Sequence, residues 1–216
     1  MRVLIACEYS GITRDAFINA GFDAMSCDLL QTESPGPHYQ GDVMDILVDG
    51  WDLMIAHPDC TYLTCSAEWA YGDGPYHQKV KPETLVGVER RKARERALSF
   101  VATLMAAPIN YKAIENPRGV ISTRIRPASQ YIQPHEYGHD ASKTTGLWLE
   151  NLPLLVPTCH IQPRMINGRP RWANQTDSGQ NKLTPRHDRW KERAKTYEGW
   201  SEAMASQWGS FLRSTA

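Results

Sequence analysis

The stretch that decides the fold is Asp52–Ala56 (DLMIA), followed directly by His57-Pro58-Asp59-Cys60 (HPDC). A short apolar run that ends in a proline and polar residues predicts a buried strand with a loop at its carboxyl end. Three further runs of this kind lie along the chain, at Arg2–Ala6, Asp23–Cys27 and Tyr111–Ile114. The sequence therefore predicts several buried strands.

Helical patterns separate these runs. They predict helices over Thr13–Ala20, Pro82–Ala107 and Ser201–Leu212, with loops over 31–39 and 66–82. Strands that alternate with helices favour an α/β fold with a Rossmann-like, doubly wound and mostly parallel sheet. The first half of the long helix, Glu89–Arg96, is charged on nearly all sides. We expect a solvated surface there, with a nucleic-acid contact as the alternative.

Polar clusters follow the predicted strands. They are Glu8-Tyr9-Ser10-Gly11, Asp28, His57-Pro58-Asp59-Cys60 and Glu115-Asn116-Pro117. Ligands bind beyond the carboxyl ends of the strands in open parallel sheets, so we expect these clusters to share one ligand-binding edge.

Cys60 and Glu115 suggest chemistry on a ring. A thiol can add to a ring carbon, and a carboxylate can offset the charge that then builds on the ring. Attaching a one-carbon group to C5 of a pyrimidine requires this pairing. The structural alternatives are that Cys60 is a small buried side chain and that Glu115 belongs to a turn.

Charge and cysteine content narrow the class of protein. The 216 residues carry no net charge, but residues 157–216 hold 10 Lys and Arg against 5 Asp and Glu, so this end could meet a polyanion. Five cysteines without a CxxC pair and the absence of a signal-peptide pattern favour a reducing cytoplasm. No apolar stretch is long enough to span a membrane, so we expect no membrane partner. The spacing of His57, Cys60 and Cys65 matches no common zinc pattern, so we expect no metal.

The order of these motifs resembles that of the cytosine-C5 DNA methyltransferases, in the compact form found in phage genomes. The segment from Ala6 to Gly11 is similar to the family's first motif, which cradles the methionine part of S-adenosylmethionine. Asp28 stands where the family binds the ribose, and Asp42 where it binds the adenine amino group. The resemblance implies S-adenosyl-L-methionine as cofactor, with contacts from Glu8, Tyr9, Ser10, Gly11, Asp28, Asp42 and Pro58.

The catalytic motifs resemble the same family. The HPDC stretch is similar to its Pro-Pro-Cys motif, with Asp59 in place of the second proline, and a carboxylate beside a thiol opposes thiolate formation. Glu115-Asn116 is similar to Glu-Asn-Val. The resemblance implies that Cys60, Glu115 and Asn116 are catalytic, and that DNA, with its target cytosine flipped out, is bound by Gln133, Lys143, Arg124, Arg126, Arg164, Arg169 and Arg171.

The resemblance divides the chain into a cofactor-binding and catalytic domain (1–156), a short basic segment (157–195) and a helix that packs back (196–216). The basic segment holds Arg164, Arg169, Arg171, Lys182, Arg186, Arg189 and Lys191, which suit phosphate contacts. Two alternatives stay open: modification of a free pyrimidine nucleotide, and a non-catalytic DNA- or cofactor-binding module. Amino-directed DNA methyltransferases need an aromatic residue that the HPDC stretch lacks.

Overall fold

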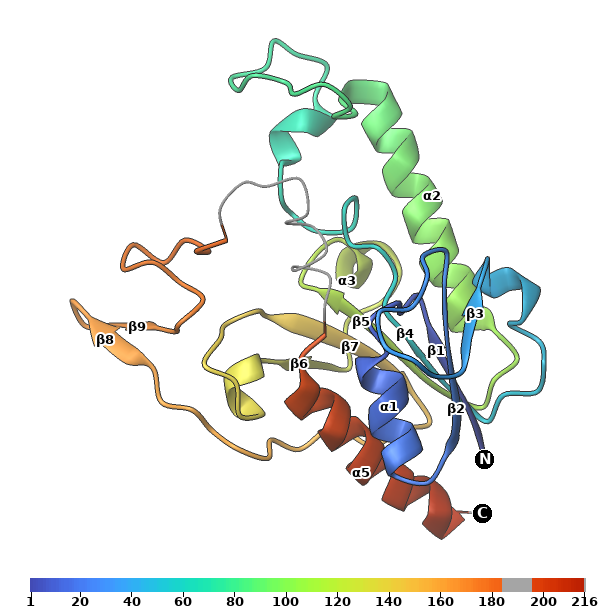
Figure 1. Cartoon of the computed structure of the whole chain (residues 1–216). Coiled ribbons are helices and arrows are strands. Elements are labelled where there is room, and N and C mark those ends of the chain that lie inside the picture. The colour runs from blue at the N-terminus through green and yellow to red at the C-terminus, as the bar shows by residue number, and fades with distance from the viewer. Residues whose placement is uncertain (184–195, 216) are drawn as a thin grey trace.

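The computed structural model describes residues 1–183 and 196–215, and its centre is a seven-stranded sheet with the order β3-β2-β1-β4-β5-β7-β6 (Figure 1). The strands are β1 (Arg2–Ala6), β2 (Asp23–Asp28), β3 (His38–Gln40), β4 (Leu53–Ala56), β5 (Tyr111–Pro117), β6 (Gln130–Ile132) and β7 (Thr145–Glu150). β1 to β5 pair in parallel, and β7 runs antiparallel between β5 and β6. This arrangement confirms the predicted Rossmann-like, mostly parallel sheet.

Helices cover both faces of the sheet (Figure 1). On one face, α1 (Ile12–Asn19) and α5 (Glu198–Thr215) bury Phe17, Trp200 and Trp208 against the strands. On the other face, α2 (Gly87–Ala106) and α3 (Ile121–Arg124) pack around Trp148 of β7. Three short 3-10 helices, η1 (Val43–Asp45), η2 (Glu68–Tyr71) and η3 (Pro134–Glu136), lie in the connections.

The strand that carries the Glu-Asn-Pro motif is longer than predicted. We expected it to end at Ile114, but β5 continues to Pro117, because Glu115 and Asn116 pair with Leu147 and Gly146 of β7. The sequence analysis did not predict β6, β7 or the three-residue β3. Glu115 therefore sits inside a strand, where pairing with β7 fixes its backbone.

The expectation of a solvated first half of α2 is wrong at two positions. Arg90 and Arg94 are buried, and both guanidinium groups lie over the ring of Tyr71. Arg94 also donates to the carbonyl oxygen of Tyr62 at 2.9 Å and pairs with Glu68 at 2.6 Å. These arginines fasten the loop after Cys60 to α2. The helix begins at Gly87, five residues later than predicted.

Part of the basic segment forms a hairpin that extends from the body of the protein (Figure 1). Its strands are β8 (Arg164–Ile166) and β9 (Arg169–Arg171). Arg186, Arg189 and Lys191 lie outside the described residues. Within the described ranges, no helix is both long and apolar enough to cross a membrane. Those ranges also contain no group of three His, Cys, Asp or Glu side chains that could hold a metal.

Candidate active site

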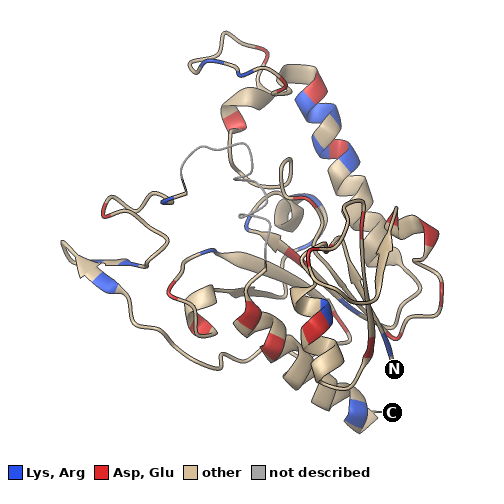
Figure 2. Ribbon diagram, in the orientation of Figure 1, with Lys and Arg blue, Asp and Glu red and all other residues tan. Residues whose placement is uncertain are grey.

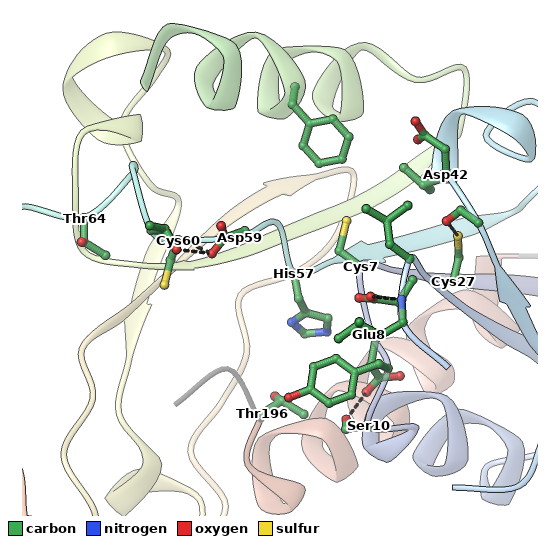
Figure 3. Close-up of a pocket in the computed structure, with 18 of the residues that line it drawn as sticks. Cys7, Glu8, Ser10, Cys27, Asp42, His57, Asp59, Cys60, Thr64 and Thr196 are labelled. Carbon is green, nitrogen blue, oxygen red and sulfur yellow. Dashed lines mark hydrogen bonds between the residues drawn. The ribbon is translucent and has the colours of Figure 1, made fainter. Parts of the chain in front are cut away.

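A cavity of about 740 Å³ opens at the carboxyl edge of the sheet (Figure 3). Its walls come from the loops after β1, β2, β3 and β4, and from one side chain of α2. The lining includes Cys7, Glu8, Tyr9, Ser10, Cys27, Asp28, Leu29, Leu30, Gly41, Asp42, Val43, His57, Asp59, Cys60, Thr61, Thr64, Ser66, Phe100 and Thr196. The fold thus brings together the residues after three of the four strands that the sequence analysis singled out. Gly11 and Pro58 are not among the lining residues.

Two carboxylates mark one part of this cavity. Oδ1 of Asp28 accepts the backbone N–H of Leu30 at 2.9 Å, and Oδ1 of Asp42 accepts that of Met44 at 3.0 Å. Each aspartate is held by its own turn and is presented to the cavity. Burial raises the pKa of Asp28 above its usual value, although the Leu30 N–H and His38 act against this. The partly desolvated carboxylate gains from a hydrogen-bond donor on a ligand.

The carboxylate of Glu8 binds backbone N–H groups in the first turn of α1. It accepts the backbone N–H groups of Thr13 at 2.7 Å and Arg14 at 3.2 Å, together with the Ser10 hydroxyl at 3.2 Å. An anion at this position satisfies donors that the helix cannot pair itself and complements the helix dipole. Gly11, at φ 79°, makes the turn into the helix. Glu8 therefore lines the cavity while its carboxylate is bound to the helix.

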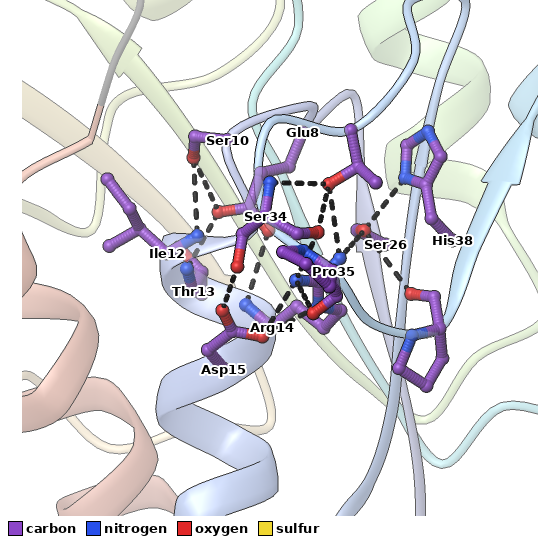
Figure 4. Close-up of polar contacts among 12 residues, drawn as sticks. Glu8, Ser10, Ile12, Thr13, Arg14, Asp15, Ser26, Ser34, Pro35 and His38 are labelled. Atoms are coloured by element: carbon purple, nitrogen blue, oxygen red, sulfur yellow. Dashed lines mark hydrogen bonds and ion pairs between the residues drawn. The ribbon is translucent and has the colours of Figure 1, made fainter.

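Arg14 was not singled out in the sequence, yet it shapes the cavity (Figure 4). Its side chain is completely buried, and its Nη2 atom donates to the carbonyl oxygens of Ser34 at 3.1 Å and Pro35 at 3.3 Å. Nη1 donates to the hydroxyl oxygens of Ser26 and Thr32. Arg14 thus holds the connection between β2 and β3 against α1. Asp28 lies at the start of this connection, and Asp42 follows β3.

Cys60 lines the cavity at a point away from these aspartates, next to Asp59 and Thr64 (Figure 3). Oδ1 of Asp59 accepts the backbone N–H and the hydroxyl of Thr61, at 3.0 and 2.8 Å. The carboxylate that replaces the family's proline therefore caps the turn that contains Cys60. Burial, followed by the charge of Asp28, raises the pKa of Cys27 to about 12 and that of Cys7 further still. Of the three thiols in the cavity wall, these two are poor nucleophiles.

His57 and Glu115 form a buried pair on adjacent strands. Nδ1 of His57 lies 2.9 Å from Oε2 of Glu115, and the two side chains are 10% and 7% exposed. Ala56 of β4 pairs with Ile114 of β5, so the next residue of each strand falls side by side. His57 lines the cavity but Glu115 does not. The sequence analysis gave His57 no role, although it begins the HPDC motif.

Among the predicted DNA-binding residues, Lys143 acts on the His57–Glu115 pair through its charge. Its positive charge helps lower the pKa of Glu115, and its backbone N–H donates to Oε1 of Gln133 at 3.0 Å. Arg124 pairs with Glu95 of α2 at 2.8 Å, and Arg126 donates to a backbone carbonyl of β7. Lys143 and Gln133 are therefore together, whereas the two arginines make contacts within the fold.

The hairpin carries three arginines (Figure 2). Arg164 and Arg169 are exposed, and Arg171 is partly buried. Arg164 pairs with Asp177 at 3.4 Å, and Arg171 donates to the backbone carbonyl of the same residue at 3.0 Å. Arg169 is exposed at the start of β9. Arg164 and Arg171 hold the loop that follows the hairpin. Arg169 could therefore contact a phosphate without breaking either of these contacts.

The cavity residues fit S-adenosylmethionine. The volume of the cavity lies in the range of small-molecule sites, about 300–1,000 Å³. Asp28 can accept hydrogen bonds from ribose hydroxyls and Asp42 from an amino group, while Val43, Leu29 and Phe100 offer apolar surface for a flat ring. The donor and acceptor types therefore suit a nucleoside at the β2–β3 end of the cavity.

Comparison with known proteins found few similarities. No protein-family model matches the chain, and no curated protein matches it. A crystal structure of a DNMT2 variant from Spodoptera frugiperda is similar at 12% identity and a TM-score of 0.38, over 79% of this chain and 57% of that one. The chain thus spans less than two thirds of the length of that structure.

Proposed function

We propose that the protein transfers a methyl group from S-adenosylmethionine to C5 of cytosine in DNA. The observation that supports this most strongly is a single cavity that joins two nucleoside-type carboxylates, Asp28 and Asp42, to the thiol of Cys60. His57 lines the same cavity and is paired with the buried carboxylate of Glu115. Bound S-adenosylmethionine would supply an electrophilic methyl group.

The residues divide the work by their chemistry. C5 of cytosine is not nucleophilic until a thiolate has added at C6, and Cys60 supplies that thiolate. The charge that then builds on the ring is offset by the pair formed by Glu115 and His57. The cytosine must leave the base stack to reach the cavity. Lys143 and the basic hairpin supply positive charge for the phosphates.

Methylation of DNA tests this proposal directly. Purified protein is incubated with plasmid DNA and S-adenosylmethionine, and the DNA is sequenced for 5-methylcytosine. Cys60→Ser should abolish the modification, because a hydroxyl is a far weaker nucleophile at neutral pH. Cys65→Ser is the matched control, since Cys65 is exposed in the same loop and does not line the cavity.

Parallel reactions separate the alternatives. Modification of deoxycytidine monophosphate but not of DNA would favour a free-nucleotide enzyme. Binding of S-adenosylhomocysteine without turnover on either substrate would favour the non-catalytic module and contradict the proposal. Activity in Cys60→Ser equal to wild type would remove the thiol from the mechanism.

A further inference from the structure

The turn of residues 60–64, called the Cys60 turn from here on, presents the thiol to the cavity (Figure 3). The carbonyl oxygen of Cys60 accepts the backbone N–H groups of Leu63 at 3.0 Å and Thr64 at 3.1 Å. Cys60 and Thr64 line the cavity, whereas Leu63 is buried in the core. The position of the thiol therefore depends on the contacts that hold the rest of this turn.

Arg94 of α2 is the first support of the Cys60 turn. Its Nε atom donates to the carbonyl oxygen of Tyr62 at 2.9 Å, and its Nη2 atom donates to that of Thr64 at 3.3 Å. Glu68 pairs with the same guanidinium at 2.6 Å, and the Arg94 side chain is 11% exposed. The rigid fork of a guanidinium suits this task, because it can donate to two carbonyl groups and a carboxylate at once.

The connection between β5 and α3 is the second support. The backbone N–H of Val120 donates to the carbonyl oxygen of Leu63 at 2.8 Å, and Gly119 forms a β-bridge with Thr64. A Cβ atom at position 119 would lie 1.9 Å from the carbonyl oxygen of Leu63 and 2.8 Å from Cα of Thr64. Only glycine lets the two backbones approach this closely.

Neither support touches the part of the cavity that suits a nucleoside. Asp28 and Asp42 are held by hydrogen bonds within their own turns. Arg94 and Gly119 are not among the residues that line the cavity. A change at either support should therefore move the thiol and leave the nucleoside end of the cavity as it is.

We propose that Arg94 is a positioning residue for Cys60, and that Arg94 and Gly119 together set the thiol in line for attack on C6 of the pyrimidine. This inference rests on the proposed function and adds two residues to it. Reacting atoms must be aligned about 3–3.5 Å apart, and a displacement of about 1 Å can cost about 10²-fold in rate. Arg94 acts only through its hydrogen bonds to the Cys60 turn.

Release of tritium from C5-tritiated cytosine measures the step in which Cys60 acts. While the thiol is bonded to C6, C5 takes a proton from water, and loss of the tritium and the thiolate then restores the ring. Release is measured for DNA and for deoxycytidine monophosphate, beside the dissociation constant of S-adenosylhomocysteine. Arg94→Ala should lower kcat for release by about 10²-fold and leave KM and this dissociation constant nearly unchanged.

Two further variants of Arg94 and its neighbour make the test specific. Arg91→Ala is the matched control, because Arg91 donates to the carbonyl oxygen of Tyr71 and pairs with Asp73, in the same loop but beyond the Cys60 turn. Its kcat should equal that of the wild type. Arg94→Lys keeps the positive charge but lacks the planar fork, so its kcat should lie between those of Arg94→Ala and the wild type.

Gly119→Ala tests the second support without removing a charge. The added Cβ must displace the carbonyl group of Leu63, so kcat should fall while the affinity for S-adenosylhomocysteine stays. Gly72→Ala is its matched control in the same loop. A Cβ at position 72 makes only an ordinary contact, 3.7 Å from the carbonyl oxygen of Trp69, and φ there is −76°.

Three outcomes would overturn this inference while the proposed function stands. Arg94→Ala and Gly119→Ala could both keep the wild-type kcat, so that neither support sets the thiol. The affinity for S-adenosylhomocysteine could fall in step with kcat, which indicates a general effect on the fold. Arg91→Ala could be as slow as Arg94→Ala, so that the contacts to the Cys60 turn carry no special role. If the wild type released no tritium from either substrate, the proposed function would fail and this inference with it.

Discussion

Nδ2 of Asn116 donates a hydrogen bond to the carbonyl oxygen of Pro58 at 2.7 Å. This bond joins the Glu-Asn-Pro strand to the loop that carries Cys60, and both residues are buried. Among the described residues, Oδ1 of Asn116 is buried without a hydrogen-bond partner. Asn116 therefore connects the Glu-Asn-Pro strand to the loop of the HPDC motif, across 58 residues of sequence.

Replacing Asn116 with alanine should destabilise the fold. The carbonyl of Pro58 would remain buried without its donor, which costs about 1–3 kcal/mol. Urea denaturation measures the change, and Asn151→Ala is the matched control because it removes an exposed amide bonded to Asn110. If both variants lost the same stability, the buried bond to Pro58 would stabilise the fold no more than the exposed bond of Asn151 does.

Asp28→Ala should weaken cofactor binding and leave DNA affinity nearly unchanged. The lost hydrogen bonds to a charged acceptor should cost about 1.5–3 kcal/mol each at most. Calorimetry with S-adenosylhomocysteine checks this, with Asp23→Ala at the other end of β2 as the control. An unaltered dissociation constant for Asp28→Ala would mean that the ribose does not lie there.

The hairpin should contribute affinity for any DNA sequence. Each phosphate contact releases counterions, so Arg169→Gln should reduce the slope of log K against log salt by about 0.9. Arg164→Gln and Arg171→Gln should have mixed effects, because these side chains also hold the following loop. Fluorescence anisotropy on a labelled duplex gives the slopes, with Arg213→Gln at the end of α5 as the control. Equal slopes in all variants and the wild type would contradict a backbone-facing hairpin.

The His57–Glu115 pair should make the free energy of unfolding depend on pH in the acid range. The pKa of Glu115 in the folded protein lies below its ordinary value of 4.5, so the carboxylate stabilises the fold. This contribution is fully present above the ordinary value and is lost as the pH falls through the lower, folded-state value. The stability difference between wild type and Glu115→Gln should therefore shrink as the pH falls below the ordinary value of 4.5. Urea denaturation at several pH values measures it, and a constant difference would mean that Glu115 is not ionised in the fold.

Sequence reasoning found the first strands of the sheet. β1, β2 and β4 were predicted within one residue at each end. The buried side chains of β1 and β4 make continuous apolar runs, whereas β2 mixes apolar and polar residues. β6 and β7 were missed, since the three residues of β6 are too short to show a pattern. The burial of Arg90 and Arg94 was also missed: their partners Tyr71 and Glu68 lie in a loop whose position depends on the folded chain.

The sequence by itself determined the apolar strands and the order of the polar motifs behind them. These are local properties, because a strand needs a run of apolar residues and a loop needs proline and polar ones. The tertiary structure alone decided which of those polar side chains faces the cavity. Register between β4 and β5 sets His57 beside Glu115, and Thr13 of α1, bonded to Ser201 of α5, lies against the imidazole. Such contacts join residues far apart in the chain, so their geometry exists only once the sheet has formed.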